Sequence, residues 1–155
     1  MELIIIRGRQ NDGKTTTATL LHNTLVGRSS AVRLLKTNGD YLSVGQNLCD
    51  FKSVIDLGRK RVAIISAGDV DDTLNEEMDD LIMMYRPDIL VVCARTRDYP
   101  GSSYRMLNEK YRNNMNPENE FWVDYTDDSG LMLEAKRTVA EKIANRIEEL
   151  KIDPR

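Results

Sequence analysis

Apolar-rich runs separated by longer amphipathic segments dominate this chain. The runs occupy residues 3–6, 31–35, 62–65, 89–93 and 121–123, and we expect each to form a strand. Most are continuously apolar rather than alternating, which is typical of strands that are covered on both faces. The pattern therefore predicts a sheet with a layer of helices on each side.

Four segments place apolar side chains three or four positions apart, as amphipathic helices do: residues 14–26, 72–85, 103–113 and the C-terminal segment. Asp128 or Ser129 is the expected N-cap of the last helix. Its predicted apolar stripe is Leu131, Ala135, Val139, Ile143, Ile147 and Leu150. We also expect a short helix over residues 50–57, ended by Gly58, and a loop over residues 37–48.

Helices placed between buried strands predict right-handed crossovers and parallel strand pairs. We therefore expect an α/β fold, a three-layer α/β/α sandwich whose mainly parallel sheet has about five strands. Residues 1–155 contain no internal repeat and no linker, which predicts a single domain. In such folds ligands bind at the carboxyl ends of the strands.

Composition and charge narrow the classes of partner. The formal net charge is −3, so long-range attraction to nucleic acid or to an anionic membrane is not favoured. No apolar run approaches the length of a membrane span. The chain has two cysteines and one histidine, His22, without a metal-ligand spacing, which argues against zinc. These features predict a cytoplasmic protein with reduced thiols.

One motif carries specific chemistry. The first strand is followed directly by Gly8-Arg9-Gln10-Asn11-Asp12-Gly13-Lys14-Thr15, and a predicted helix begins at Lys14. Glycines at both ends of this loop let consecutive N–H groups point inward at phosphate oxygens, and the helix N-terminus adds partial positive charge. Lys14 is expected to neutralise the β- and γ-phosphates, the Thr15 hydroxyl to bind magnesium, and Thr16 to reach the α-phosphate.

With this motif between a strand and a helix, the chain resembles the P-loop NTPase superfamily. The signature covers residues 8–15, and the order of elements is similar over most of the length. The resemblance implies Mg²⁺-dependent binding of ATP or GTP, with transfer or hydrolysis of a phosphoryl group.

Acidic residues after other strands are candidates for a second contact to magnesium. Asp69 follows the third strand by a few residues, and Ser66 stands where the acidic residue of this pattern is usually found. Asp40 follows the second strand, and the resemblance to P-loop kinases of small molecules implies that it contacts the metal or the phosphate acceptor. For both aspartates a structural role in a turn or an N-cap is the alternative.

Arginines follow the fourth strand. The resemblance to P-loop kinases implies that Arg95 and Arg97 cover the transferring phosphoryl group, and Arg105 is placed to join them. Solvated loop charges are the alternative. No Asn-Lys-x-Asp segment that would select guanine is present. Trp122 is expected to fill the core or an interface, and residues 125–127 follow it where many P-loop folds bind the base.

Three functions remain open at this stage. In the first, a small kinase transfers the γ-phosphoryl group of ATP to a small-molecule acceptor between Asp40 and the arginines. In the second, a hydrolysing switch contacts a protein partner according to its nucleotide state. In the third, the chain binds nucleotide without catalysis. Catalysis is assigned to Lys14, Asp69, Arg95 and Arg97, and the kinase hypothesis is favoured because of the small size and the arginines.

Overall fold

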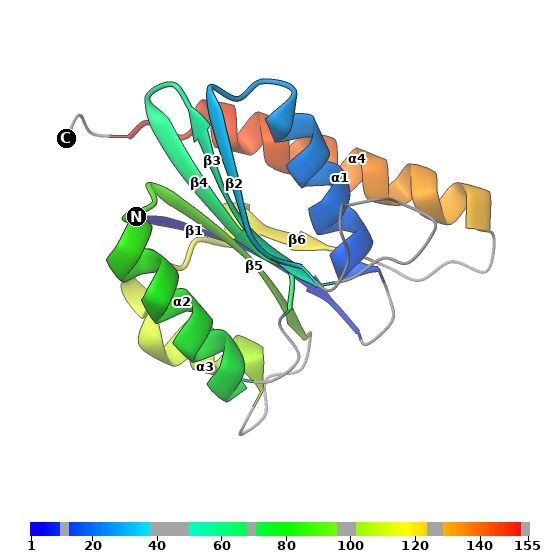
Figure 1. Ribbon diagram of the computed structural model, residues 1–155. Helices are drawn as coiled ribbons and strands as arrows, with labels where there is room; N and C mark the ends of the chain where they lie inside the picture. The colour runs from blue at the N-terminus through cyan, green and yellow to red at the C-terminus, as the bar shows by residue number, and fades with distance from the viewer. Residues whose placement is uncertain (10–12, 38–49, 68–70, 96–101, 124–128, 153–155) are drawn as a thin grey trace.

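The computed structural model describes residues 1–9, 13–37, 50–67, 71–95, 102–123 and 129–152 of the chain (Figure 1). The first half contains β1 (Glu2–Gly8), α1 (Lys14–Val26), β2 (Ala31–Thr37), β3 (Phe51–Leu57) and β4 (Lys60–Ile65). The second half contains α2 (Asp71–Tyr85), β5 (Ile89–Arg95), α3 (Ser103–Lys110), the 3₁₀ turns η1 (Arg112–Asn114) and η2 (Pro117–Asn119), β6 (Glu120–Trp122) and α4 (Ser129–Glu149).

The described strands form one sheet of six in the order β2-β3-β4-β5-β1-β6. β1 is parallel to both of its neighbours, β5 and β6, and β4 is parallel to β5. β3 is antiparallel to both β2 and β4. The α/β class is confirmed, but the predicted mainly parallel sheet of about five strands is wrong, because the sheet is mixed and has six strands.

The additional strand is the segment for which we predicted a short helix. Residues 51–57 form β3, which joins β4 through a tight turn at Gly58 and Arg59. Gly58 has a φ of 70°, which suits glycine and favours hairpin formation. The β-branched Val54 and Ile55 are buried in the sheet. The apolar spacing of this short segment fits both a helix and a strand, and pairing with β2 and β4 decides between them. The predicted loop over residues 37–48 falls outside the described residues from 38 onward.

Helices cover both faces of the sheet, with α1 and α4 on one face and α2 and α3 on the other (Figure 1). The crossover from β1 to β2 through α1 runs toward one edge of the sheet, whereas those from β4 to β5 and from β5 to β6 run in the opposite direction. Because right-handed crossovers of opposite direction place their helices on opposite faces, α1 lies on one side and α2 and α3 on the other. α4 packs beside α1.

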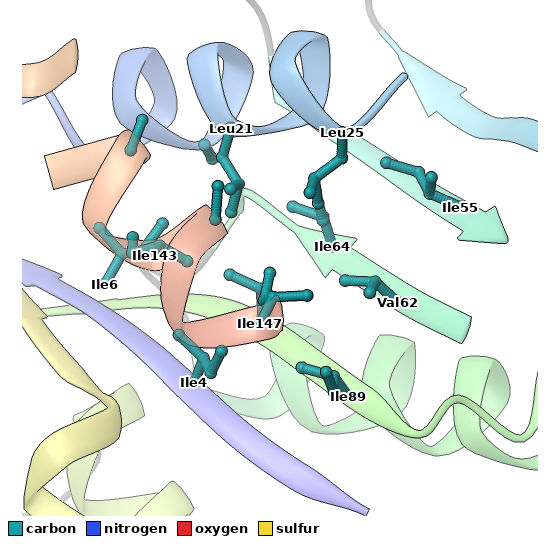
Figure 2. Close-up of a cluster of buried hydrophobic side chains, with 14 of the residues drawn as sticks. Ile4, Ile6, Leu21, Leu25, Ile55, Val62, Ile64, Ile89, Ile143 and Ile147 are labelled. Carbon is teal, nitrogen blue, oxygen red and sulfur yellow. The ribbon is translucent and has the colours of Figure 1, made fainter. Parts of the chain in front are cut away.

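Alternate residues along the strands feed two separate cores. Ile4, Ile6 and Ile64 pack with α1 and α4, whereas Leu3, Ile5 and Ile65 pack with α2 and α3. Figure 2 shows the first cluster, in which Leu21 and Leu25 of α1 and Ile143 and Ile147 of α4 meet the strands. Fully burying a side chain of this size stabilises a fold by about 1.5–3 kcal/mol, so these positions hold the layers together.

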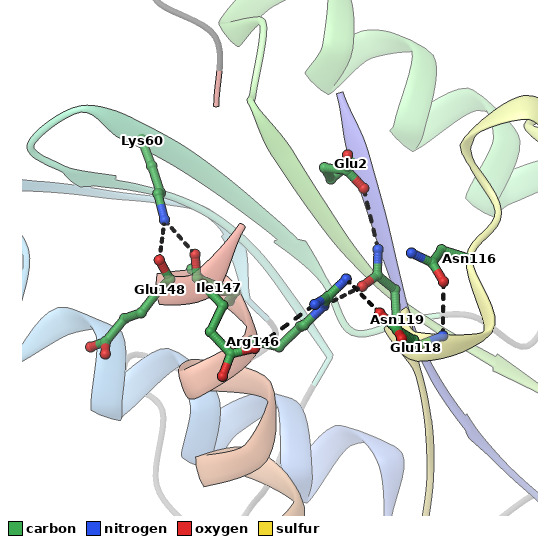
Figure 3. Close-up of polar contacts among 9 residues, drawn as sticks. Glu2, Lys60, Asn116, Glu118, Asn119, Arg146, Ile147 and Glu148 are labelled. Carbon is green, nitrogen blue, oxygen red and sulfur yellow. Dashed lines mark hydrogen bonds and ion pairs between the residues drawn. The ribbon is translucent and has the colours of Figure 1, made fainter. Parts of the chain in front are cut away.

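Polar contacts fix the C-terminal end of α4 against the sheet (Figure 3). Lys60 Nζ donates hydrogen bonds of 2.7 Å to the carbonyl oxygens of Ile147 and Glu148, which satisfies acceptors of the last helical turn. Arg146 Nε donates to Asn119 Oδ1 at 2.7 Å, and Asn119 Nδ2 donates to a carboxylate oxygen of Glu2 at 3.3 Å. The position of α4 along the sheet is therefore fixed from its C-terminal end.

The buried face of α4 differs from the predicted stripe. Ile143, Ile147 and Leu150 are buried as expected, but Ala135 is exposed. The side chains that complete the buried face are Lys136, Ala140 and Ala144. The face is thus rotated toward positions one residue later in the chain, because α4 packs against α1 as well as the sheet.

Several strands end, and one begins, on the same side of the sheet. Gly8 at the end of β1 is in register with Arg95 at the end of β5, and Ile65 at the end of β4 pairs with Lys52 near the start of β3. The carboxyl ends of β1, β4 and β5 and the start of β3 therefore face the same side, which we call the carboxyl edge. No helix within the described ranges has the length and apolarity required to cross a membrane.

Candidate functional site

The turn between β1 and α1 lies at the carboxyl edge. Gly8 ends β1, and Gly13 immediately precedes α1 with a φ of 94°, a left-handed conformation that a side chain would strain. Gly13 O accepts hydrogen bonds of 3.0 Å from both Thr17 N and Thr17 Oγ1. Because glycine has no side chain, the N-cap residue supplies no side-chain hydrogen bond to the first N–H groups of α1. The predicted strand–turn–helix arrangement is confirmed, and Gln10, Asn11 and Asp12 lie outside the described residues.

Lys14 folds back over the start of this turn. Its Nζ donates to the carbonyl oxygens of Gly8 at 3.0 Å and Arg9 at 2.8 Å, and the residue is only 7% exposed. Burying an ammonium group is costly unless it is well hydrogen-bonded, and these two carbonyls supply part of the compensation. The fold therefore holds a buried positive charge at the start of the turn, beside Gly8 and Arg9.

Thr15 has an acidic partner that the sequence analysis did not assign to the site. Its Oγ1 donates a hydrogen bond of 3.1 Å to Asp50 Oδ1, and Asp50 is exposed directly before β3. A hydroxyl and a carboxylate are oxygen ligands of the kind that Mg²⁺ prefers, with water completing its shell. The described residues contain no cluster of three or more His, Cys, Asp or Glu side chains that would hold a metal without such help.

Ser66 fixes the segment that carries Asp50. Phe51 N donates to Ser66 Oγ at 2.7 Å, and Ser66 N donates to Phe51 O at 3.0 Å. These two bonds hold the start of β3 at the end of β4. Ser66 stands where the acidic residue of the motif is usually found, and in the structure its hydroxyl accepts a bond that positions Phe51, the neighbour of Asp50. The other two metal candidates, Asp69 and Asp40, lie outside the described residues.

The predicted arginines occupy different surroundings. Arg95 ends β5 opposite Gly8, and its backbone N donates to Ser103 Oγ at 3.2 Å. Arg105 lies on α3 and forms an ion pair of 3.1 Å with Glu109 of the same helix. Arg97 lies outside the described residues. Arg95 is therefore the predicted arginine that the fold brings beside the end of β1.

An arginine near the end of β1 stacks on two aromatic rings. The guanidinium of Arg7 lies between the ring of Tyr104, 3.5 Å from its centroid, and that of Trp122, at 4.2 Å. Trp122 is 50% exposed, so it does not fill the core, and the alternative that it fills an interface stays a prediction. Cation–π stacking on Arg7 stabilises an indole that is otherwise in contact with solvent.

Two further residues near the turn have structural roles. His22 is buried on α1, where Nδ1 lies 2.9 Å from Ser53 Oγ and the ring meets Phe51 edge-on. Burial lowers the pKa of the His22 imidazole from its ordinary value of 6.5 to about 4. Cys93 is a buried free thiol, and its Sγ lies 3.7 Å from Lys14 O.

The sequence analysis did not predict the contact between Asp50 and Thr15, and it missed Lys136. We predicted that Asp50 begins a short helix. In the structure it directly precedes β3, and this position brings it to Thr15. Lys136 of α4 is 4% exposed and packs against Gly13. A lysine four residues before Ala140 on the buried face of α4 was the available signal. Comparison of the chain with known protein families, curated proteins and solved structures found no match.

Proposed function

We propose that this chain binds a nucleoside triphosphate with Mg²⁺ through the turn between β1 and α1, as a member of the P-loop NTPases. The observation that carries the proposal is the position of Lys14, whose buried ammonium lies on the Gly8 and Arg9 carbonyls next to the N-terminus of α1, where the N-cap is a glycine. The ammonium and the helix N-terminus together favour a polyphosphate.

The Thr15–Asp50 pair supports a magnesium site at the same place. Thr15 is the second residue of α1, and Asp50 approaches it from β3 across a distance of 3.1 Å. Mg²⁺ bound there would take the Thr15 hydroxyl directly and Asp50 directly or through water, and the remaining positions would go to phosphate oxygens and water. Magnesium would supply charge neutralisation between the phosphates.

Transfer of the γ-phosphoryl group to a small acceptor is the reaction we propose, with ATP as the donor. Arg95 supports this reaction, because it is the last residue of β5 and is paired in register with Gly8, where the phosphate turn begins. A guanidinium in this region stabilises negative charge that develops during phosphoryl transfer. Hydrolysis that switches contact with a protein partner is the alternative reaction for the same site.

The test is a calorimetric titration of the protein with ATP and with GTP, each with and without Mg²⁺. We expect Mg²⁺-dependent binding of at least one nucleotide, with ATP preferred. Lys14→Ala is expected to weaken binding by about 100-fold or more, since a charged hydrogen-bonding group is lost from the phosphates. Lys142→Ala, on the exposed face of α4, is the matched control and should bind as the wild type does.

A second variant tests the metal. Asp50→Asn is expected to reduce the gain in affinity that Mg²⁺ provides and to leave metal-free binding unchanged, because it removes a carboxylate and keeps the shape. Asp80→Asn, an exposed residue of α2, is the control. Normal ATP binding by Lys14→Ala would contradict the phosphate site, and an unchanged magnesium effect in Asp50→Asn would contradict only the metal assignment. Once binding is established, incubation with labelled ATP and candidate acceptors distinguishes transfer from hydrolysis.

A further inference from the structure

A lysine interrupts the apolar face of the last helix. Ala140, Ile143, Ala144 and Ile147 are buried on one face of α4, and Lys136 precedes Ala140 by one helical turn on that face. The residue is only 4% exposed. Lysine is rarely buried to this extent, because its ammonium loses the solvation of water. What the tip of this side chain contacts is therefore informative.

The tip of the Lys136 side chain occupies the space that Gly13 leaves open. A β-carbon added to Gly13 would lie 2.1 Å from Cε and 2.2 Å from Nζ of Lys136. The ammonium therefore lies against the last residue of the phosphate turn, at the N-terminus of α1. Gly13 is required twice over, by its positive φ and by this contact.

Two buried ammonium groups consequently flank the same turn. Lys14 lies on the carbonyls of its first residues, Gly8 and Arg9, whereas Lys136 lies against its last residue, Gly13. The N-terminus of α1 adds partial positive charge between them. A polyanion bound at the turn would be attracted by both ammonium groups and by the helix N-terminus.

We infer that Lys136 is a second phosphate-contacting lysine, which reaches the polyphosphate of the bound nucleotide from α4 at the Gly13 end of the turn. The inference rests on the proposed function, because it adds a residue to the same site. It also gives α4 a role in binding: the anchoring of its C-terminal end by Lys60 and by the Arg146–Asn119 contact sets how far along the turn Lys136 reaches.

The test compares Lys136→Met with Lys142→Met. Methionine keeps the unbranched apolar stem that packs on α1 and removes only the charge, and Lys142 lies on the exposed face of the same helix. Calorimetric titration with ATP and Mg²⁺ is expected to show binding weakened by about 10- to 100-fold in Lys136→Met, as for loss of a charged hydrogen bond. Binding by Lys142→Met should equal that of the wild type.

A measurement on the wild-type protein covers the case in which Lys136→Met does not fold. Lysine side chains are acetylated with a reactive ester, and the extent of modification at each lysine is read by mass spectrometry. ATP with Mg²⁺ should slow modification of Lys136 several-fold and leave Lys142 unchanged. If Lys136→Met binds ATP as tightly as the wild type does, or if the nucleotide does not protect Lys136, the inference is overturned and the proposed function is left intact. Failure of the wild type to bind ATP or GTP overturns both.

Discussion

Thr15 and Asp50 are 35 positions apart in the chain, yet their side chains share a hydrogen bond. Lys136 is still farther from Gly13 in sequence and packs directly on it. At the scale of single residues, the chemistry of the site is therefore assembled from three elements: the turn before α1, the start of β3 and the first half of α4. Lys14 and Thr15 follow from the local motif, but their partners come from distant parts of the chain.

His22 provides a prediction at the residue scale. Because its pKa is lowered to about 4 in the folded protein, the unfolded chain binds the proton more readily between pH 6.5 and pH 4. The stabilisation from the neutral imidazole is complete above pH 6.5 and is lost as the pH falls toward 4, and the total loss is about 3 kcal/mol.

Denaturant unfolding at pH 7 and at pH 4.5 measures this loss. His22→Gln removes the titrating group, so its free energy of unfolding should fall between these pH values by about 2–3 kcal/mol less than that of the wild type. His22 is the single histidine of the chain, so no other imidazole contributes. Equal pH dependence in the two proteins would show that the imidazole is protonated as easily in the folded state as in the unfolded one.

At the scale of elements, the hairpin between β3 and β4 determines where Asp50 lies. Pairing of β3 with β4 brings Lys52 opposite Ile65, and the Ser66–Phe51 bonds complete the junction. If these residues formed a helix, the strand pairing and the Ser66–Phe51 bonds would be absent and would not hold Asp50 beside Thr15. Gly58, at the turn of the hairpin, thus favours the strand pairing that places Asp50 beside Thr15 at the opposite end of β3.

Gly58→Ala tests that requirement. A β-carbon at Gly58 would meet no atom within 4 Å, so the positive φ of 70° is the source of the expected strain. We expect a loss of about 1–2 kcal/mol in the free energy of unfolding, measured by urea denaturation. Gly27→Ala is the control, because Gly27 has a right-handed φ of −62°. The control should be neutral or stabilise by about 0.5–1 kcal/mol. Equal effects at the two glycines would contradict the assigned turn.

At the scale of the whole molecule, the site lies between elements that belong to different layers. The turn and α1 belong to one helical layer together with α4, whereas β3, β4 and β5 form the sheet beneath them. A ligand that contacts the turn, Asp50 and Lys136 at once connects these layers and stabilises the folded state over the unfolded chain.

Thermal unfolding with and without nucleotide tests this connection. At a nucleotide concentration of about 100 times Kd, binding adds about 2.7 kcal/mol to the stability. For a domain of this size we expect ATP with Mg²⁺ to raise Tm by about 5–10 °C. The rise should be smaller in Asp50→Asn and in Lys136→Met. An unchanged Tm in the wild type at saturating nucleotide would mean that the ligand does not bind the folded protein preferentially.

The sequence by itself determined the parts of this protein that depend on neighbours a few residues away. The β1–turn–α1 unit, the ranges of α2, β5 and α4, and the identities of Lys14 and Thr15 follow from periodicity, glycine positions and one motif. These features were predictable because helix spacing and the left-handed preference of glycine act locally.

Only the tertiary structure decided the order of the strands, the strand conformation of residues 51–57, and the contacts of Asp50 and Lys136 with the turn. The physical reason is that strand pairing and helix packing join residues far apart in the chain. A short apolar segment fits either a helix or a strand until its partners are known. Likewise, a lysine on the buried face of α4 gains its significance from the glycine against which α4 packs.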